Sequence, residues 1–279
     1  MQPVPPPDKR TRAGRDLTAA LGVGLGLGAV VLLSLYVWKV AFVGIAALAI
    51  VLALGELANA FAARAIRLPL VPVVIGAVAI LVAAYGGGPE PMLVALAITV
   101  LGLMVWRLAD DPAGYLRDVA AGVFATFYLP FLAGFAVLLL RADDGPNRVV
   151  FFVLLVVLSD TGGYASGVFL GKHPMAPTVS PKKSWEGFGG SAMFCAVGGA
   201  VGGYFLVDLQ PWQGVLTGLV ALCSATLGDL GESMIKRDLG IKDMGSLLPG
   251  HGGLLDRLDS LLPTAPVVYL MLAWLGPGS

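Results

Sequence analysis

The chain has 279 residues, of which 57% are hydrophobic and only 13% are charged, and its mean hydropathy is +0.84. Soluble globular proteins carry about 25% charged residues, so this composition excludes an ordinary water-soluble domain and indicates a membrane protein. Basic and acidic residues balance at 18 each, and this balance gives no electrostatic reason to expect nucleic acid as a partner.

The chain begins with a polar, proline-rich segment, 1–16, that contains four basic residues. We expect this segment to be a disordered cytosolic tail, and we expect 17–279 to form a single transmembrane helical domain. The apolar run Leu17–Trp38 is too long for the core of a signal peptide and lacks a clear cleavage site. It is therefore predicted to be a retained first span.

A membrane-spanning helix needs roughly 20 mostly apolar residues, and runs of about this length recur along the chain. They are rich in glycine, which lets helices pack closely in lipid. The predicted fold is all-α, a polytopic integral membrane protein with about nine transmembrane helices and a cytosolic N-terminus. The predicted spans are Leu17–Trp38, Val40–Ala60, Leu68–Tyr85, Met92–Trp106, Val119–Leu140, Val149–Leu170, Phe188–Val207, Trp212–Leu230 and Leu262–Leu275.

The positions of Lys and Arg support this arrangement, because cytosolic segments of membrane proteins are enriched in both residues. With the tail in the cytosol, 15 of the 18 basic residues fall in cytosolic segments, and only Lys39, Arg141 and Arg148 fall on the outer side. The two longest polar segments after the tail, 171–187 and 231–261, then face the cytosol, where nucleotides are available.

The cytosolic end of the eighth span carries a group of polar side chains. Asp229, Glu232 or Ser233, and Lys236 are spaced i, i+3 or i+4, and i+7, so they share one face of a helix. That face offers a carboxylate, a hydroxyl and an ammonium together. Considered alone, Asp229 with Lys236 is equally well explained as an ion pair on a helix surface.

A Gly-His-Gly-Gly turn at 250–253 then precedes a helix whose first turns carry Asp256 and Asp259. Glycines let backbone N–H groups approach a ligand closely, and the N-terminus of a helix favours anions. Mg²⁺ prefers one or two protein carboxylates, with phosphate oxygens and water completing its shell. The segment 228–260 therefore suits a divalent metal and a polyphosphate, although Asp256 alone is also explained as a helix N-cap.

A second polar stretch, 160–187, begins inside the sixth span. An ionisable residue at the depth of Asp160 is costly and is a candidate for function, although a hydrogen bond to a neighbouring helix also explains it. Lys182 and Lys183 follow in the loop and are also explained as ordinary flanking residues of a span. Ser180 and Glu186 beside them favour a phosphate-binding loop.

The residues in these two stretches resemble a known family, the phosphatidate cytidylyltransferases or CDP-diacylglycerol synthases. The resemblance is carried by Ser233-x-Ile235-Lys236-Arg237-x4-Lys242-Asp243-x-Gly245-x2-Leu248-Pro249-x-His251-Gly252-Gly253-Leu254-x-Asp256-Arg257-Leu258-Asp259. Asp160-Thr161-Gly162-Gly163-Tyr164 and Ser180-Pro181-Lys182-Lys183-Ser184-x-Glu186-Gly187 are also similar to motifs of this family, with Gly163 in place of a frequent Ala and Ser184 in place of a frequent Thr. The strong resemblance covers about the C-terminal half of the chain.

The resemblance implies a CTP-dependent nucleotidyltransferase of the bacterial plasma (inner) membrane, often homodimeric, that makes CDP-diacylglycerol and pyrophosphate from CTP and phosphatidic acid. It implies Mg²⁺ as cofactor, held by Asp229 and Asp256, with K⁺ as a candidate second cation. The residues assigned to catalysis are Asp229, Asp256, Lys236, Arg237, Asp160, Asp243 and Asp259. Those assigned to substrate binding are Ser180, Lys182, Lys183, Glu186, Ser233, Lys242, His251, Gly252, Gly253 and Arg257.

Three other functions remain open from the sequence. A transferase acting on another lipid phosphate, such as an isoprenoid ether lipid, needs the same chemistry, and a CTP-dependent polyprenol kinase is more distant. A cation-coupled transporter is a different class, in which Asp160 and Glu56 would line an ion path. Clustering of the charged motifs on one side of the membrane favours the enzyme.

Overall fold

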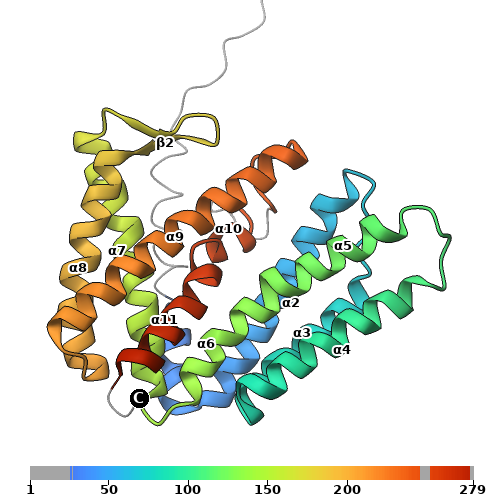
Figure 1. Ribbon diagram of the computed structural model, residues 1–279, viewed down its shortest axis with the longest axis horizontal. Helices are drawn as coiled ribbons and strands as arrows, with labels where there is room; N and C mark the ends of the chain where they lie inside the picture. Colours follow the sequence, from blue (N-terminus) through green and yellow to red (C-terminus); the bar gives the residue numbers. More distant parts are fainter. Residues whose placement is uncertain (1–25, 27, 246–251, 277–279) are drawn as a thin grey trace, which may run out of the picture.

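The computed structural model describes residues 26, 28–245 and 252–276, and helices dominate this part of the chain (Figure 1). The elements are α2 (Lys39–Ala62), α3 (Leu70–Gly87), α4 (Pro89–Arg107), α5 (Tyr115–Thr126), the π-helix η1 (Phe127–Phe131), α6 (Leu132–Arg141), α7 (Gly145–Leu170), β1 (Pro174–Ala176), β2 (Ser180–Ser184), α8 (Trp185–Val207), α9 (Pro211–Leu239), α10 (Leu255–Leu258) and α11 (Leu261–Leu275). The all-α expectation is confirmed apart from one two-stranded antiparallel hairpin, β1–β2, which the sequence did not predict.

Eight helices in the described residues are long and apolar enough to cross a membrane. They correspond to the second through ninth predicted spans, and the protein is a polytopic membrane protein. The last span is longer than predicted, because α10 and α11 together cover Leu255–Leu275. Of the first predicted span, the structure describes the helix Gly28–Val37, while the tail 1–16 lies outside the described residues.

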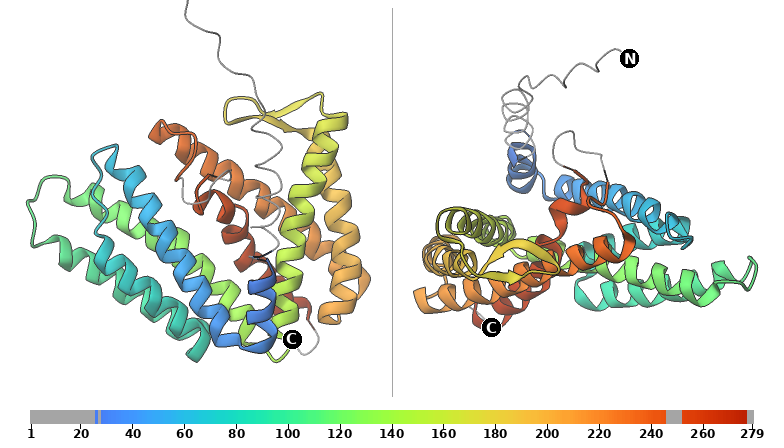
Figure 2. Two further views of the ribbon diagram at one scale, coloured as in Figure 1. Left: turned by 180° about the vertical axis from the view of Figure 1, so that it is seen from behind. Right: turned by 90° about the horizontal axis from the view of Figure 1, so that it is seen from above.

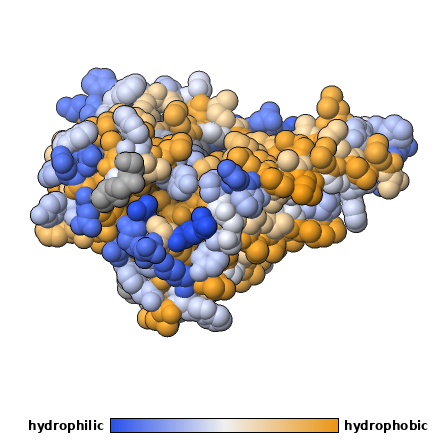
Figure 3. Space-filling model, turned by 60° about the horizontal axis from the view of Figure 1, so that its bottom comes forward, coloured by the Kyte–Doolittle hydropathy of each residue, from blue (hydrophilic) through white to orange (hydrophobic). Residues whose placement is uncertain are grey.

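Many large apolar side chains lie on the outside of these helices. Ile75, Ile98 and Phe205 are 65%, 63% and 76% exposed in the isolated chain. On the face drawn in Figure 3, hydrophobic residues form broad continuous areas and hydrophilic residues gather in patches. Apolar areas of this extent are rare on soluble proteins, so lipid is the natural solvent for these faces.

The helices form two groups that α11 joins (Figures 1 and 2). In one group α8 packs between α7 and α9, and in the other α3 packs against α4 and α6; α11 contacts both α9 and α6. The α8–α9 contact depends on glycine, because a Cβ added to Gly199 would lie 2.2 Å from the carbonyl oxygen of Gly214. Such close backbone approach is typical of helix pairs in membranes.

The fifth span is one continuous helix from Tyr115 to Arg141 with a π-helical turn in its middle. Pro130 lies in this turn, and proline has no N–H to donate to the preceding turn. A single π-turn accommodates such an interruption without ending the helix. The predicted bounds, Val119–Leu140, missed the first turn, which carries the charged residues Arg117 and Asp118.

Contacts at the two ends of the helices agree with the predicted alternation of the spans. At one end, the Lys39 ammonium donates to the carbonyl oxygen of Ala142 in the α6–α7 turn, at 2.8 Å. At the other end of α2, Arg64 Nε donates to the carbonyl oxygen of Leu239 at the end of α9, at 3.0 Å. Lys39 and Arg64 therefore lie at opposite ends of the bundle.

Candidate active site

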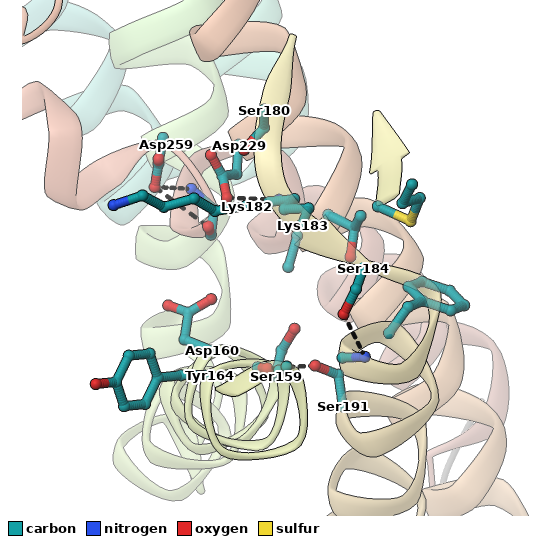
Figure 4. A pocket seen from close by; sticks show the side chains of 18 of the residues that line it. Ser159, Asp160, Tyr164, Ser180, Lys182, Lys183, Ser184, Ser191, Asp229 and Asp259 are labelled. Atoms are coloured by element: carbon teal, nitrogen blue, oxygen red, sulfur yellow. Dashed lines mark hydrogen bonds and ion pairs between the residues drawn. The ribbon is translucent and has the colours of Figure 1, made fainter. Parts of the chain in front are cut away.

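A polar pocket of about 470 Å³ lies between α7, α8, α9, α10 and the β1–β2 hairpin (Figure 4). This volume is in the range of small-molecule sites. Both polar stretches singled out in the sequence, 160–187 and 228–260, contribute to it, although residues 188–227 separate them along the chain. Its walls are formed by Ser159, Asp160, Gly163, Tyr164, Gly167, Met175, Ser180, Lys182, Lys183, Ser184, Gly187, Phe188, Ser191, Ala225, Thr226, Asp229, Asp256, Arg257, Asp259 and Ser260.

Four carboxylates reach this pocket from three directions. Asp160 comes from α7, Asp229 from α9, and Asp256 and Asp259 from α10 and the residue that follows it. Asp160 makes no hydrogen bond or ion pair within the described residues, and Figure 4 shows its carboxylate pointing into the space below Asp229 and Asp259. The structure thus brings together acids that the sequence placed in two separate motifs.

Cations line the same pocket. Lys182 and Lys183 lie on β2, and Lys183 Nζ forms an ion pair with Asp229 Oδ2 at 2.5 Å. Arg237 of α9 does not line the pocket. Its Nε donates to the carbonyl oxygen of Val179, in the turn of the hairpin, at 2.5 Å, and this contact fixes the hairpin against α9. The hairpin therefore carries basic side chains over the acidic end of α9.

Asp256 lines the pocket and is held by a network of hydrogen-bond donors. Its carboxylate accepts hydrogen bonds from Lys236 Nζ at 2.9 Å, from the Gly253 N–H at 2.8 Å and from the Met244 N–H at 3.1 Å. Lys236 also lies 3.4 Å from Glu232 Oε2. The predicted shared face of α9 is confirmed, since Ser233 Oγ in turn donates to Asp229 at 3.5 Å.

Hydroxyl groups and glycines complete the wall formed by α7 and α8. Ser184 caps α8 by accepting a hydrogen bond from the Gly187 N–H at 3.1 Å, a contact that fixes the start of the helix. Ser191 Oγ donates to the carbonyl oxygen of Ser159 at 2.5 Å. A Cβ on Gly163 would lie 2.7 Å from Ser191 Oγ, so glycine at this position allows the two helices to approach.

Several residues assigned to the site lie outside the pocket lining. Glu186 accepts hydrogen bonds from the backbone of Lys172 and His173 and pairs with the His173 ring at 2.5 Å, so it holds the start of the hairpin. Lys242 and Asp243 are exposed. His251 lies outside the described residues. The others behind or beside the lining are Lys236, Arg237, Ser233, Gly252 and Gly253.

Comparison with known proteins accounts for this combination of membrane helices, acids and cations. The Cytidylyltransferase family profile matches residues 18–275. The chain belongs to the cytidylyltransferase family. It is 41% identical over 283 residues to the phosphatidate cytidylyltransferase of Mycobacterium tuberculosis strain H37Rv, covering 97% of this chain and 86% of that protein. The Mycobacterium leprae protein of the same name is 41% identical over 95% of this chain and 90% of its own length.

A more distant relative has the same name. The phosphatidate cytidylyltransferase of Staphylococcus aureus strain COL is 32% identical over 228 residues, covering 79% of this chain and 85% of that protein. The family match begins near the start of the first predicted span and ends in α11. It therefore includes the N-terminal half, where the sequence alone suggested a family likeness only through its hydrophobic spans.

The structure places further polar residues in or beside the pocket that were not in the assigned set. Glu232 is fully buried on α9, and neither carboxylate oxygen has a hydrogen-bond partner within the described residues. Its i+3 spacing from Asp229 already placed it on the functional face. Ser159 and Ser191 line the pocket, but nothing in their apolar sequence surroundings distinguished them from ordinary small residues of a packed span.

The donor set of the pocket fits Mg²⁺. Oxygen ligands are what this cation prefers, and it usually takes one or two carboxylates together with phosphate oxygens and water. No group of three or more acids, histidines or cysteines within the described residues is placed to hold a metal alone. Asp229 and Asp256 line the pocket with Asp160 and Asp259 beside them, so a shared site completed by substrate phosphates fits these residues.

Proposed function

We propose that the protein transfers the cytidylyl group of CTP to phosphatidic acid, giving CDP-diacylglycerol and pyrophosphate. The observation that carries this function is the convergence of four carboxylates with Lys182, Lys183 and Arg257 in one pocket of a polytopic membrane protein. Membership of the cytidylyltransferase family and the names of its relatives support the same reaction.

In this reaction a phosphate oxygen of phosphatidic acid attacks the α-phosphorus of CTP. A new P–O bond forms as the bond between the α-phosphorus and the bridging oxygen of the β-phosphate breaks, and pyrophosphate leaves. The attacking phosphate is already ionised near neutral pH, so catalysis depends on positioning and on neutralising charge. Lys182, Lys183 and Arg257 line the pocket and are assigned to the phosphates.

Bound Mg²⁺ would neutralise charge on the triphosphate and on the departing pyrophosphate. Asp229 and Asp256 would hold it, and the Lys183–Asp229 and Lys236–Asp256 pairs orient both carboxylates in the structure. Asp160 and Asp259 would position water or lysine side chains nearby. K⁺ remains a candidate second cation, and a homodimer remains a prediction from the family resemblance.

We place the pocket on the cytosolic side of a bacterial plasma membrane. CTP is available on that side, and the excess of Lys and Arg in the same segments supports the orientation. The acyl chains would stay in lipid while the head group enters the pocket. Accessibility of single cysteines, introduced at exposed Asp243 and Asp143, to a membrane-impermeant thiol reagent in intact cells tests this orientation.

Purified protein in vesicles containing phosphatidic acid should convert CTP to a CDP-lipid detectable by mass spectrometry, with one pyrophosphate released per lipid. Competition between phosphatidic acid, an isoprenoid ether lipid phosphate and a polyprenol separates the alternative acceptors. If folded protein neither binds nor consumes CTP, the proposed enzymatic function is wrong and the cation-coupled transporter becomes the favoured hypothesis.

A further inference from the structure

Helix α2, which belongs to the N-terminal half, makes a buried contact with the start of α10. Glu56 is only 5% exposed. Its Oε2 accepts a hydrogen bond from the Leu255 N–H at 2.9 Å, across 199 residues of sequence. Leu255 directly precedes Asp256, so the acceptor on α2 holds the backbone that carries a carboxylate of the pocket.

The backbone around Glu56 leaves no room for side chains. A Cβ added to Gly245 would lie 2.1 Å from Glu56 Oε1, and one added to Gly253 would lie 2.8 Å from Glu56 Oε2 and 2.9 Å from Asp256 Oδ2. Two carboxylates, one from α2 and one from α10, therefore flank the Gly253 backbone. Glycine is needed at both positions because the backbone passes too close to these carboxylates to carry a side chain.

A second contact holds the other end of the same connection. Arg64 lies eight residues beyond Glu56, in the turn that follows α2, and its Nε donates to the carbonyl oxygen of Leu239, the last residue of α9. Gly240 follows with φ of +71°, and a Cβ there would lie 2.9 Å from Arg64 Nη2. Helix α2 thus contacts the chain where it enters α10, and the turn after α2 contacts the chain where it leaves α9.

We propose that Glu56 is a positioning residue, which acts through the Leu255 backbone to hold Asp256 in place, with Arg64 fixing the end of α9. The second span would then support the active site without lining the pocket. Burial of a carboxylate is costly unless it is paired or hydrogen-bonded, and Glu56 Oε1 has no hydrogen-bond partner within the described residues. A role in holding the α10 backbone explains why a carboxylate lies in this apolar setting. The kinetic part of the test rests on the proposed function, whereas the hydrogen-exchange part does not.

The test compares Glu56→Ala and Glu56→Gln with Asp118→Asn in the full-length, detergent-purified protein. Asp118 controls for the loss of a buried carboxylate elsewhere in the protein, because it also accepts a backbone N–H from another segment, Arg67, at 3.1 Å, and in addition pairs with the buried Arg107. It lies on α5 and does not line the pocket. Glutamine keeps an acceptor for the Leu255 N–H, whereas alanine removes it.

We expect Glu56→Ala to lower kcat by about 10- to 100-fold, where the upper value is the loss that a misplacement of about 1 Å causes, with a smaller change in KM. Glu56→Gln should recover most of this loss. Hydrogen exchange of a peptide covering 252–258 should accelerate at least about tenfold in Glu56→Ala and stay unchanged in Asp118→Asn. A kcat within twofold of the parent protein, or equal losses in Asp118→Asn, would overturn the proposal.

A double-mutant cycle provides a readout that a general loss of stability would not give. Gly245→Ala introduces a methyl group against Glu56 Oε1, so it should lower kcat strongly alone and add little in the Glu56→Ala background. Additive losses would contradict the direct contact. The exchange measurement needs no substrate, so it still decides the positioning role if the parent protein makes no CDP-lipid, an outcome that would reject the proposed function separately.

Discussion

Lys236 lies between two acidic side chains, and its removal provides a quantitative prediction for the stability of the site. Its side chain is 16% exposed, while those of Asp256 and Glu232 are 10% and 0% exposed. Lys236→Met keeps the aliphatic volume but leaves both carboxylates without their ammonium partner. Breaking a buried ion pair by removing one partner costs about 3–5 kcal/mol, so we expect a loss of about 4 kcal/mol in the free energy of unfolding.

Part of this cost should be recoverable. Asp256 keeps the N–H donors of Gly253 and Met244, whereas Glu232 keeps no hydrogen-bond partner within the described residues. Adding Glu232→Gln to Lys236→Met removes the fully buried carboxyl group that has lost its ammonium neighbour, and we expect the double variant to regain about 2 kcal/mol, about half of the cost estimated above. The measurement is reversible SDS unfolding of detergent-purified protein, followed by circular dichroism.

Lys182→Met is the control, because Lys182 is exposed and makes no ion pair within the described residues. We expect it to change the free energy of unfolding by less than about 0.5 kcal/mol. The reasoning is refuted if Lys236→Met costs less than about 1 kcal/mol, or if the double variant is no more stable than the single one.

Three further outcomes are expected. Asp256→Asn should abolish turnover while the protein still inserts and folds, and retained activity in the purified variant would remove Asp256 from the metal site. Gly199→Ala should cost about 1–3 kcal/mol of stability by overpacking against Gly214, whereas Gly189→Ala, with no atom within 4 Å of the added Cβ, should cost under about 0.5 kcal/mol in the same SDS unfolding assay. Chelation of divalent cations should abolish formation of CDP-lipid and Mg²⁺ should restore it; activity that persists in excess chelator would exclude a divalent cofactor.

The spans were predictable from the sequence because each depends on local composition. A run such as Val149–Leu170 is apolar over the length that a bilayer requires, and α7 covers it. The shared face of Asp229, Ser233 and Lys236 followed from helical spacing alone. This prediction needed only the spacing of the residues along one helix. The predicted end of the span, Leu230, was too early, because α9 continues through polar residues to Leu239.

Contacts between distant parts of the chain were not predictable in this way. The hairpin has strands of three and five residues, too short for an alternating pattern to be visible, and it is fixed by the Arg237 contact from α9. Glu56 stood out in the sequence only as an acid in an apolar span. Its contact with Leu255 depends on tertiary packing that local sequence patterns do not encode.

The central claim is tested most directly by following two labels of CTP in vesicles that contain the protein, phosphatidic acid and Mg²⁺. With CTP labelled at the α-phosphate, the label should enter the lipid fraction as CDP-diacylglycerol. With CTP labelled at the γ-phosphate, it should remain in water as pyrophosphate. A γ-label in the lipid would indicate a kinase instead, and the absence of both labels from lipid, with folded protein that binds CTP, would contradict cytidylyl transfer to phosphatidic acid.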